Sequence, residues 1–248
     1  MVQKAPIPYA QRAPESLLKE RSSGNRLLDL LPPDDYDRII PHCHEVAMPL
    51  SLVVFRPEDD IDFVYLPTTC IISLLTELSD GTGLEVGLVG KEGFAGVSAI
   101  LGGTETKVGT VQAEGKALKM RAATMLEEFN RGGAFQTAVL RYLHALMTQI
   151  SQSAVCNARH PLPGRLARWL LMYHDRLCKD EFELTQEFMA AMLGVRRPGI
   201  SETASVLQKR ELIAYKRGHV RILNRKGLEG FACECYPVVA VKYDYLVL

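Results

Sequence analysis

The stretch from Ala134 to about Asn157 contains neither proline nor glycine, and it separates two parts of the chain with different residue patterns. Apolar residues recur along it at helical spacing and form two adjacent stripes, one of Leu140, Leu143, Met147 and Ile150 and the other of Phe135, Val139, Tyr142 and Leu146. This periodicity predicts one long helix with two apolar flanks. One flank can cover a neighbouring domain, and the other needs a second partner.

The second apolar flank favours a symmetric dimer, because two-fold pairs are the commonest oligomers and a long helix between domains is a suitable seam. We assign the dimer interface to Phe135, Val139, Tyr142 and Leu146. The alternative is a helix buried entirely inside one domain, since apolar spacing over so few turns fits both arrangements.

Before the long helix, the sequence predicts two short helices and then an antiparallel β-roll. The helix signals of 26–31 and 35–40 end at prolines, which disfavour the helical conformation in the residue before them. Asp80-Gly81 between two apolar runs is a hairpin signal, and many short strands at this spacing indicate a roll or barrel. The β-rich runs cover 51–55, 63–66, 70–75, 84–89, 108–113 and 117–120.

Charge is distributed unevenly, although the whole chain is neutral with 29 Lys and Arg against 29 Asp and Glu. Residues 159–226 hold fourteen of the basic and seven of the acidic residues, a net charge of +7, which leaves fifteen and twenty-two, or −7, for the rest. The basic third therefore predicts a module that binds a polyanion, joined to a module that binds something else.

The basic third also has the spacing of a helix-turn-helix followed by a wing. Thr185 suits the N-cap of the middle helix, and Gly194 suits the left-handed residue that ends it. Residues 212–223 predict a basic hairpin with Gly218 in its turn. The three predicted helices cover 162–177, 185–193 and about 197–209.

The third of these helices predicts a surface that reads DNA bases. Ile200, Ala204 and Leu207 fall on one face and should pack inward, which turns a polar face outward. Arginine can pair bidentately with guanine, and hydroxyls serve bases or phosphates. The predicted DNA-binding residues are Thr185, Gln186, Arg196, Arg197, Ser201, Glu202, Ser205, Lys216, Arg217 and Arg221.

Together these segments resemble the Crp/Fnr family of bacterial transcription regulators. The resemblance runs from about Asn25 to Gly230 and rests on LLDLLP at 27–32, the long helix, and above all LTQEFMAAMLGVRR at 184–197. It implies an α+β fold with a cyclic-nucleotide-binding-like β-roll, a dimerisation helix and a C-terminal winged helix-turn-helix that binds a palindromic operator. The implied divisions are an N-terminal arm (1–25), the roll with flanking helices (26–133), the dimerisation helix and hinge (134–160), the DNA-binding domain (161–235) and a C-terminal tail (236–248).

One departure from the family pattern concerns the effector. Phe94 stands where nucleotide-binding members have a glutamate for the ribose, and Lys107-Val108 stand where they have an arginine and a small hydroxyl residue for the phosphate. Without the fork-shaped donor and the hydroxyl, most directed bonds to a phosphate are lost, although Lys107 can still hold an anion. We therefore expect an effector site at Phe94, Lys107 and Val108 that does not take cAMP.

Other chemistry finds little support in the sequence. The common nucleophile, phosphate-loop, zinc-protease and dinucleotide motifs are missing, so we predict no enzyme activity, no catalytic residue and no cofactor. His42-Cys43-His44 lacks a second ligand pair at zinc-like spacing, and no metal site is predicted. Cys233-Glu234-Cys235 has the wrong separation for a redox CxxC pair, which leaves a redox switch there as a hypothesis.

The combined interpretation is a cytoplasmic, homodimeric, sequence-specific DNA-binding transcription regulator without a membrane segment or a secretory signal. Its expected partners are double-stranded DNA, a second copy of the chain, RNA polymerase and an unidentified small-molecule effector. Pro198 and Glu202 replace a glutamate and an arginine of the family pattern, so the operator should be a different one. The alternative is a ligand-sensing module that controls a protein partner without specific DNA binding.

Overall fold

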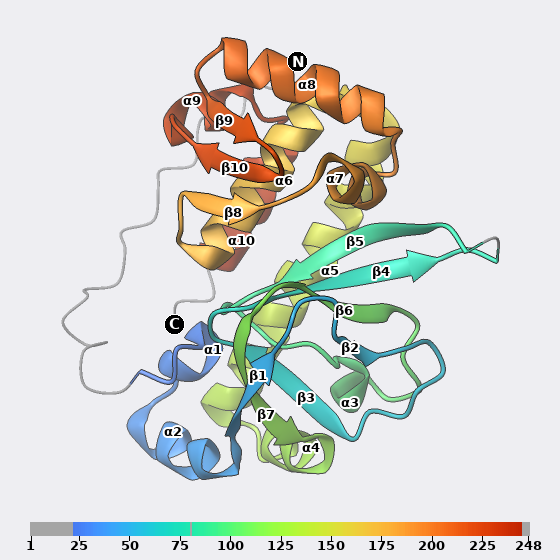
Figure 1. Ribbon diagram of the computed structural model, residues 1–248. Helices are drawn as coiled ribbons and strands as arrows, with labels where there is room; N and C mark the ends of the chain where they lie inside the picture. Colours follow the sequence, from blue (N-terminus) through green and yellow to red (C-terminus); the bar gives the residue numbers. More distant parts are fainter. Residues whose placement is uncertain (1–21, 80, 245–248) are drawn as a thin grey trace, which may run out of the picture.

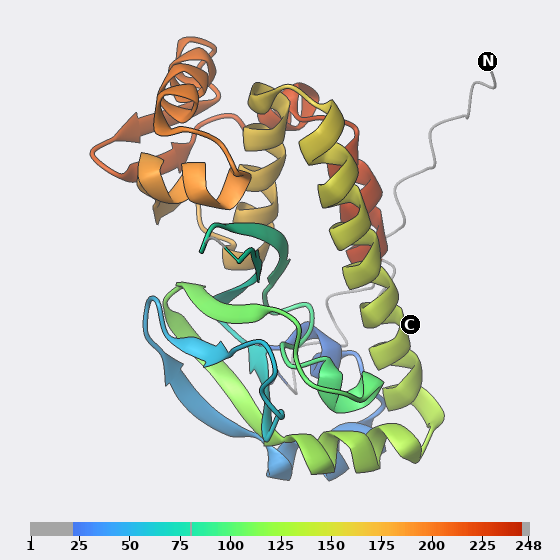
Figure 2. The same ribbon diagram turned by 90° about the vertical axis from the view of Figure 1, so that its right-hand side faces the viewer.

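The computed structural model describes residues 22–79 and 81–244 and shows a mixed α and β architecture in two parts (Figure 1). A β-roll formed by the first half of the chain lies at one end, and a helical domain with a small sheet lies at the other. The long helix α5 (Gly133–Arg159) runs beside the roll and continues to the second part (Figure 2). The predicted α+β class, with a roll, a long helix and a C-terminal helix-turn-helix, is confirmed.

Asn25 ties the beginning of the described chain into the roll. Its side chain is fully buried and caps helix α1 (Arg26–Asp29) by accepting from the N–H of Leu27. Its amide donates to the carbonyl oxygens of Pro67 at 2.8 Å and Gly93 at 2.9 Å. The predicted arm of residues 1–25 therefore ends inside the roll, and its first twenty-one residues lie outside the described part.

Prolines set the limits of the next helices. Helix α2 (Pro33–Ile39) begins two residues before the predicted start, because proline fits the first helical turn without losing a hydrogen bond. A short 3₁₀ helix, η2 (Ile40–His42), follows it and contains Pro41. The proline therefore ends the α-helix, as predicted, but not the helical turn.

Two antiparallel sheets form the roll, a three-stranded sheet of order β1-β7-β3 and a four-stranded sheet of order β2-β6-β4-β5. All six predicted runs contain strands; β1 was not predicted because most of its side chains are exposed and show no apolar alternation. Glu77 pairs with Gly83, which confirms the predicted hairpin, whereas Asp80 lies outside the described residues. The strands are β1 (His44–Met48), β2 (Val53–Phe55), β3 (Phe63–Pro67), β4 (Ile71–Glu77), β5 (Gly83–Val89), β6 (Val108–Ala113) and β7 (Gly115–Arg121).

The roll packs against α5 through the stripe that the sequence analysis assigned to a dimer. Helices α3 (Ser98–Leu101) and α4 (Ala122–Asn130) precede α5. The ring of Tyr142 lies so close to Gly93 that a Cβ there would be 1.8 Å from the ring, and its hydroxyl donates to the Phe94 carbonyl at 2.7 Å. The dimer assignment is wrong because its four side chains are already buried within their own chain, namely Phe135, Val139, Tyr142 and Leu146.

The second part contains the predicted helix-turn-helix with its wing. Helices α6 (Leu162–Leu177) and α8 (Arg197–Lys209) have the predicted limits, and α7 (Gln186–Leu193) begins immediately after its N-cap Thr185. The wing is a three-stranded sheet of order β8-β10-β9, in which β8 was not predicted. The remaining elements are β8 (Glu181–Glu183), β9 (Ile213–Lys216), β10 (His219–Ile222) and α9 (Arg225–Phe231).

The segment predicted as a C-terminal tail is a helix. Helix α10 (Cys235–Asp244) lies alongside α5 and also contacts α6 (Figure 2). Tyr236, Val239 and Tyr243 recur at helical spacing and are buried, so tertiary packing overrides the β-propensity of the valines. Residues 245–248 lie outside the described part of the chain.

A buried polar network joins the two parts of the molecule. The Nε of Arg176 on α6 lies 2.8 Å from an oxygen of Glu92 in the roll, and both side chains are buried. Its Nη2 donates to the Leu88 carbonyl at 3.1 Å and to Gln149 of α5 at 2.7 Å. The hydroxyl of Tyr243 on α10 donates to the same Gln149 oxygen at 3.2 Å. One guanidinium therefore bridges the roll and α5, and α10 joins it through the shared Gln149 oxygen.

We predict that Arg176→Met lowers the free energy of unfolding by about 3–5 kcal/mol, because it leaves Glu92 buried without a counter-charge. The double variant Arg176→Met/Glu92→Gln should be more stable than Arg176→Met alone, since no unpaired charge remains buried. Urea denaturation of the purified chain measures both values. A loss below about 1 kcal/mol, the range of exposed ion pairs, would contradict a buried bridge.

Candidate nucleic-acid interface

The helix-turn-helix is held by its two local caps. The Thr185 hydroxyl accepts from the N–H of Phe188 at 3.1 Å, and Gly194 ends α7 with φ of 61°. A side chain at Gly194 would also press on Leu84 of the roll, with a Cβ 2.7 Å from it. Arg196 is extended and leads directly into α8. The turn thus presents the first residues of α8 at the surface.

Helix α8 has the predicted division into an inner and an outer face. Ile200, Ala204 and Leu207 are buried, which confirms the predicted inner face, and Thr203 is buried beside them. The outer face is polar and borders the wing at the end of the molecule opposite the roll (Figure 1). Its predicted members Arg196, Arg197, Glu202 and Ser205 are exposed, and Ser201 is half-buried.

The turn of the wing is a two-residue loop that connects β9 to β10. Arg217 and Gly218 have φ of 50° and 84°, the left-handed pair that suits a tight hairpin with the normal twist of β-strands. Lys216 and Arg217 are exposed beside it. Arg221 is also exposed but lies 3.2 Å from Glu181 on the neighbouring strand β8. Of the wing cations, Arg221 is shared with a carboxylate, whereas Lys216 and Arg217 have no carboxylate partner within the part of the chain that the structure describes.

Arg197 forms an ion pair with a residue of the preceding helix. Its Nε lies 2.9 Å from a carboxylate oxygen of Glu187, with 63% and 64% of the two side chains exposed. Exposed pairs of this kind contribute at most about 1 kcal/mol. The arginine can therefore exchange Glu187 for another acceptor at little cost.

Three arginines of the basic third are not part of this surface. Arg165, Arg168 and Arg176 are buried. Arg165 donates to Asn157 and to the Leu193 carbonyl, and Arg176 belongs to the network described above. The net charge of residues 159–226 therefore overstates the charge available to a polyanion. Exposed cations at the start of α8 and on the wing are Arg196, Arg197, Lys216, Arg217 and Arg221, whereas other exposed cations, such as Lys209 and Arg210 at the end of α8, lie elsewhere.

Comparison with known families identifies this part of the chain. A sequence family described as the Crp-like helix-turn-helix domain matches residues 164–231, which contain α7, α8, the wing and most of α6. The chain carries a Crp-like helix-turn-helix domain. A search of curated proteins finds no significant match.

Solved Crp-type structures share the fold of the chain. FixK2 from Bradyrhizobium japonicum has a TM-score of 0.67 at 13% identity, covering 77% of this chain and 98% of its own. A CRP/FNR-family regulator from Thermus thermophilus has a TM-score of 0.60 at 18% identity, covering 76% and 98%. A mutant of CooA from Carboxydothermus hydrogenoformans has a TM-score of 0.62 at 14% identity, covering 86% and 97%.

The domain match and the shared fold agree with the predicted resemblance to the Crp/Fnr family: the former for residues 164–231, the latter for the fold. Across the described residues, no helix is both long enough and apolar enough to cross a membrane.

The three residues predicted for an effector site differ in exposure, since Phe94 and Val108 are buried and Lys107 is half-buried. Phe94 is fully buried, with its ring 5.1 Å from that of Tyr142 on α5. Val108 is buried in strand β6, whereas the amino group of Lys107 contacts the Thr106 hydroxyl at 3.0 Å. Phe94 therefore serves the contact between roll and central helix, and Lys107 alone offers a charge to a ligand.

A second polar contact between roll and Crp-like domain was missed by sequence analysis. Glu85 of β5 is buried and accepts from Ser73 at 2.7 Å, Gln112 at 2.8 Å and the indole N–H of Trp169 on α6 at 2.6 Å. Burial raises the pKa of Glu85 from 4.5 to about 7, against the opposing effect of these donors and Arg176. The sequence contains no local sign that Glu85 is buried, because Glu85 is a single acidic residue in a strand and the residue that covers it, Trp169, lies on the distant helix α6.

We predict that Glu85 makes stability fall as the pH rises. Because the pKa of Glu85 is higher in the folded chain than in the unfolded chain, the folded form binds the proton more tightly between about pH 5 and pH 7. The full shift corresponds to roughly 3 kcal/mol. The stability difference between the wild type and Glu85→Gln, measured by urea denaturation from about pH 5 to pH 8, should change by an amount of this order. A difference independent of pH would show that Glu85 titrates normally.

Proposed function

We propose that the protein regulates transcription by binding a pseudo-palindromic operator as a homodimer, without cAMP as its effector. The observation that carries the proposal is the exposed first turn of α8, with Arg197 at its start and a polar outer face, beside a cationic wing. An α-helix fits the major groove, where the base edges are distinguishable. Such a regulator acts in the cytoplasm, next to DNA and RNA polymerase.

The base contacts are assigned to the outer face of α8. Arg197 exchanges Glu187 for guanine and donates two parallel hydrogen bonds to it. Glu202 can accept from the amino group of cytosine, and Ser201 and Ser205 support these contacts. A carboxylate in this position makes the half-site differ from that of family members with an arginine there.

The phosphate contacts are assigned to the edges of this face. Lys216 and Arg217 on the wing are exposed cations without a described carboxylate partner. Arg221 can join them when it leaves Glu181. Arg196 before α8 and the pair Thr185 and Gln186 at the start of α7 complete the set, since helix N-termini favour phosphate.

The homodimer is assigned to the outer side of α5 instead of the buried stripe. Exposed residues recur along α5 at alternating intervals of three and four, the spacing of a coiled-coil seam. Leu140 and Met147 are apolar members with 52% and 67% of their surface exposed. Two-fold pairing of α5 would present the α8 helices to half-sites about 34–36 Å apart. The seam residues are Thr137, Leu140, His144, Met147, Ser151, Ala154 and Ala158.

An effector, where one acts, should be a small anion rather than cAMP. The buried ring of Phe94 cannot accept a hydrogen bond from a ribose hydroxyl as a glutamate would. Lys107 supplies a point charge in place of the bidentate donor, and Val108 supplies no hydroxyl. These side chains support independence from cAMP.

We predict that Arg197→Ala weakens binding to the preferred duplex by about 1–3 kcal/mol and leaves binding to random duplex nearly unchanged. Lys216→Ala should weaken both alike and reduce the dependence on salt by about one phosphate contact. Fluorescence anisotropy titrations of both duplexes at several salt concentrations measure this difference. Equal losses on both duplexes for Arg197→Ala would contradict base reading, and binding without salt dependence would favour a regulator that acts on a protein partner.

We predict that Met147→Glu weakens the dimer at least about tenfold, or 1.4 kcal/mol, because it places a charge in an apolar seam. Leu101→Glu is the matched control, since Leu101 is also 67% exposed but lies on α3. Analytical ultracentrifugation over a range of concentrations gives the dissociation constants. An unchanged dimer in Met147→Glu would place the interface elsewhere.

A further inference from the structure

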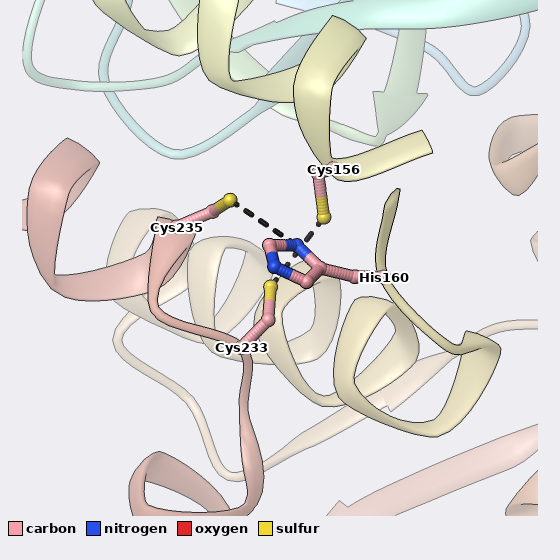
Figure 3. A group of neighbouring side chains, drawn as sticks. All are labelled: Cys156, His160, Cys233 and Cys235. Carbon is pink, nitrogen blue, oxygen red and sulfur yellow. Dashed lines mark hydrogen bonds between the residues drawn. The ribbon is translucent and has the colours of Figure 1, made fainter. Parts of the chain in front are cut away.

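Four potential metal ligands converge where α5 ends. The side chains of Cys156, His160, Cys233 and Cys235 point toward one another (Figure 3), and their ligand atoms all lie within 4.8 Å of one another. The Cys156 and Cys233 sulfurs are 3.4 Å apart, and the Cys235 sulfur is 3.5 Å from Nδ1 of His160. Among the described residues, this is the one group of three or more such side chains.

Local structure supplies the ligands as two pairs. Cys156 lies in the last turn of α5, and His160 is the extended residue that ends the helix. The His160 N–H donates to the Cys156 carbonyl at 3.0 Å. Cys233 lies in the connection between α9 and α10, and Cys235 is the first residue of α10. The Cys233 N–H donates to the carbonyl of Gly164 at the start of α6, at 3.3 Å. Both pairs are therefore held by backbone that is already ordered.

We propose that Cys156, His160, Cys233 and Cys235 bind one Zn²⁺ ion in a closed structural site. Zinc takes four ligands tetrahedrally, with bonds of about 2.3 Å to sulfur and 2.0–2.1 Å to nitrogen, which sets ligand atoms ~3.5–3.8 Å apart. The two distances given above agree with this spacing to within a few tenths of an ångström. Three thiolates and one imidazole are a common structural zinc set.

The surroundings of the cluster have the features of a metal site. Nδ1 of His160 faces the cysteines, and its other ring nitrogen lies 3.5 Å from the Glu234 carboxylate. A metal-binding histidine usually directs its second nitrogen to a carboxylate in this way. The buried guanidinium of Arg168 interacts electrostatically with all three cysteines and can balance the net negative charge of a zinc ion with three thiolates.

The site would connect three elements at the hinge of the molecule. It joins the end of α5 to the connection that leads into α10, and the Cys233 backbone is bound to the start of α6. Bound zinc would hold the first turn of α6, and with it the Crp-like domain, in place relative to the central helix. The sequence predicted no metal site because the two ligand pairs are far apart along the chain.

The test is metal analysis of the full-length chain purified without chelators or a metal-affinity tag. We expect about one zinc per chain in the wild type, less than about one-tenth of that in Cys235→Ser and His160→Ala, and full occupancy in Cys178→Ser, the control at an exposed cysteine outside the cluster. His160→Cys should retain zinc, since four thiolates also form a structural site.

Cobalt substitution of the wild type keeps the proposal testable where a variant fails to fold. Chelator treatment should lower the melting temperature, and Co²⁺ added afterwards should bind stoichiometrically, with visible bands of a tetrahedral ion and a thiolate charge-transfer band. Three results would each overturn the proposal. The first is zinc-free protein that shows none of these bands with Co²⁺, the second is a disulfide between Cys156 and Cys233 in place of metal, and the third is iron with acid-labile sulfide.

Discussion

The buried guanidinium of Arg176 is the contact on which the arrangement of the two parts depends. A buried cation is tolerated only when its donors meet acceptors and a counter-charge. Here the acceptors come from the roll and from α5, whose Gln149 also accepts from Tyr243 of α10. Because hydrogen bonds require definite distances and directions, this contact specifies one orientation of the Crp-like domain.

The same region brings residues 90–93 of the roll next to the central helix and α6. Gly90 lies so close to Arg176 that a Cβ there would be 2.6 Å from its side chain, and Gly93 lies under the ring of Tyr142. Lys91 donates to the Cys178 sulfur at the end of α6, at 2.8 Å. Residues 90–93 therefore touch both elements that carry the DNA-binding domain. A displacement of residues 90–93 would first disturb the contact between Arg176 and Glu92, and only through that contact would it affect α8.

Local signals predicted the helices of the Crp-like domain well. Helix limits in this domain depend on contacts within a few residues. Thr185 and Gly194 cap α7, and prolines occupy the first turns of α6 and α8, whose predicted limits agree with the structure. On α5, the stripe of Phe135, Val139, Tyr142 and Leu146 was also real, whereas the other predicted stripe combines exposed Leu140 and Met147 with buried Leu143 and half-buried Ile150. Periodicity shows which residues share a face, but not whether that face meets its own chain or a second one, and the dimer was assigned to the wrong stripe for this reason.

The interactions between distant segments could not be predicted in this way. Glu85 meets Trp169, and Cys156 meets Cys233, only because the folded chain brings separate elements together. In the sequence, Glu85 resembles an ordinary surface acid, and Cys156 and Cys233 resemble scattered thiols. The helical form of residues 235–244 was missed for a related reason, since its buried face is defined by α5.

The central claim is that paired α8 helices read a symmetric DNA site. Selection of bound sequences from a random duplex pool, at low and at near-physiological salt, tests it most directly. The account predicts enrichment of a two-fold-symmetric sequence with half-sites about one helical turn apart, and binding that weakens steeply with salt. No enriched sequence at either salt, with and without added cyclic nucleotides, would contradict it.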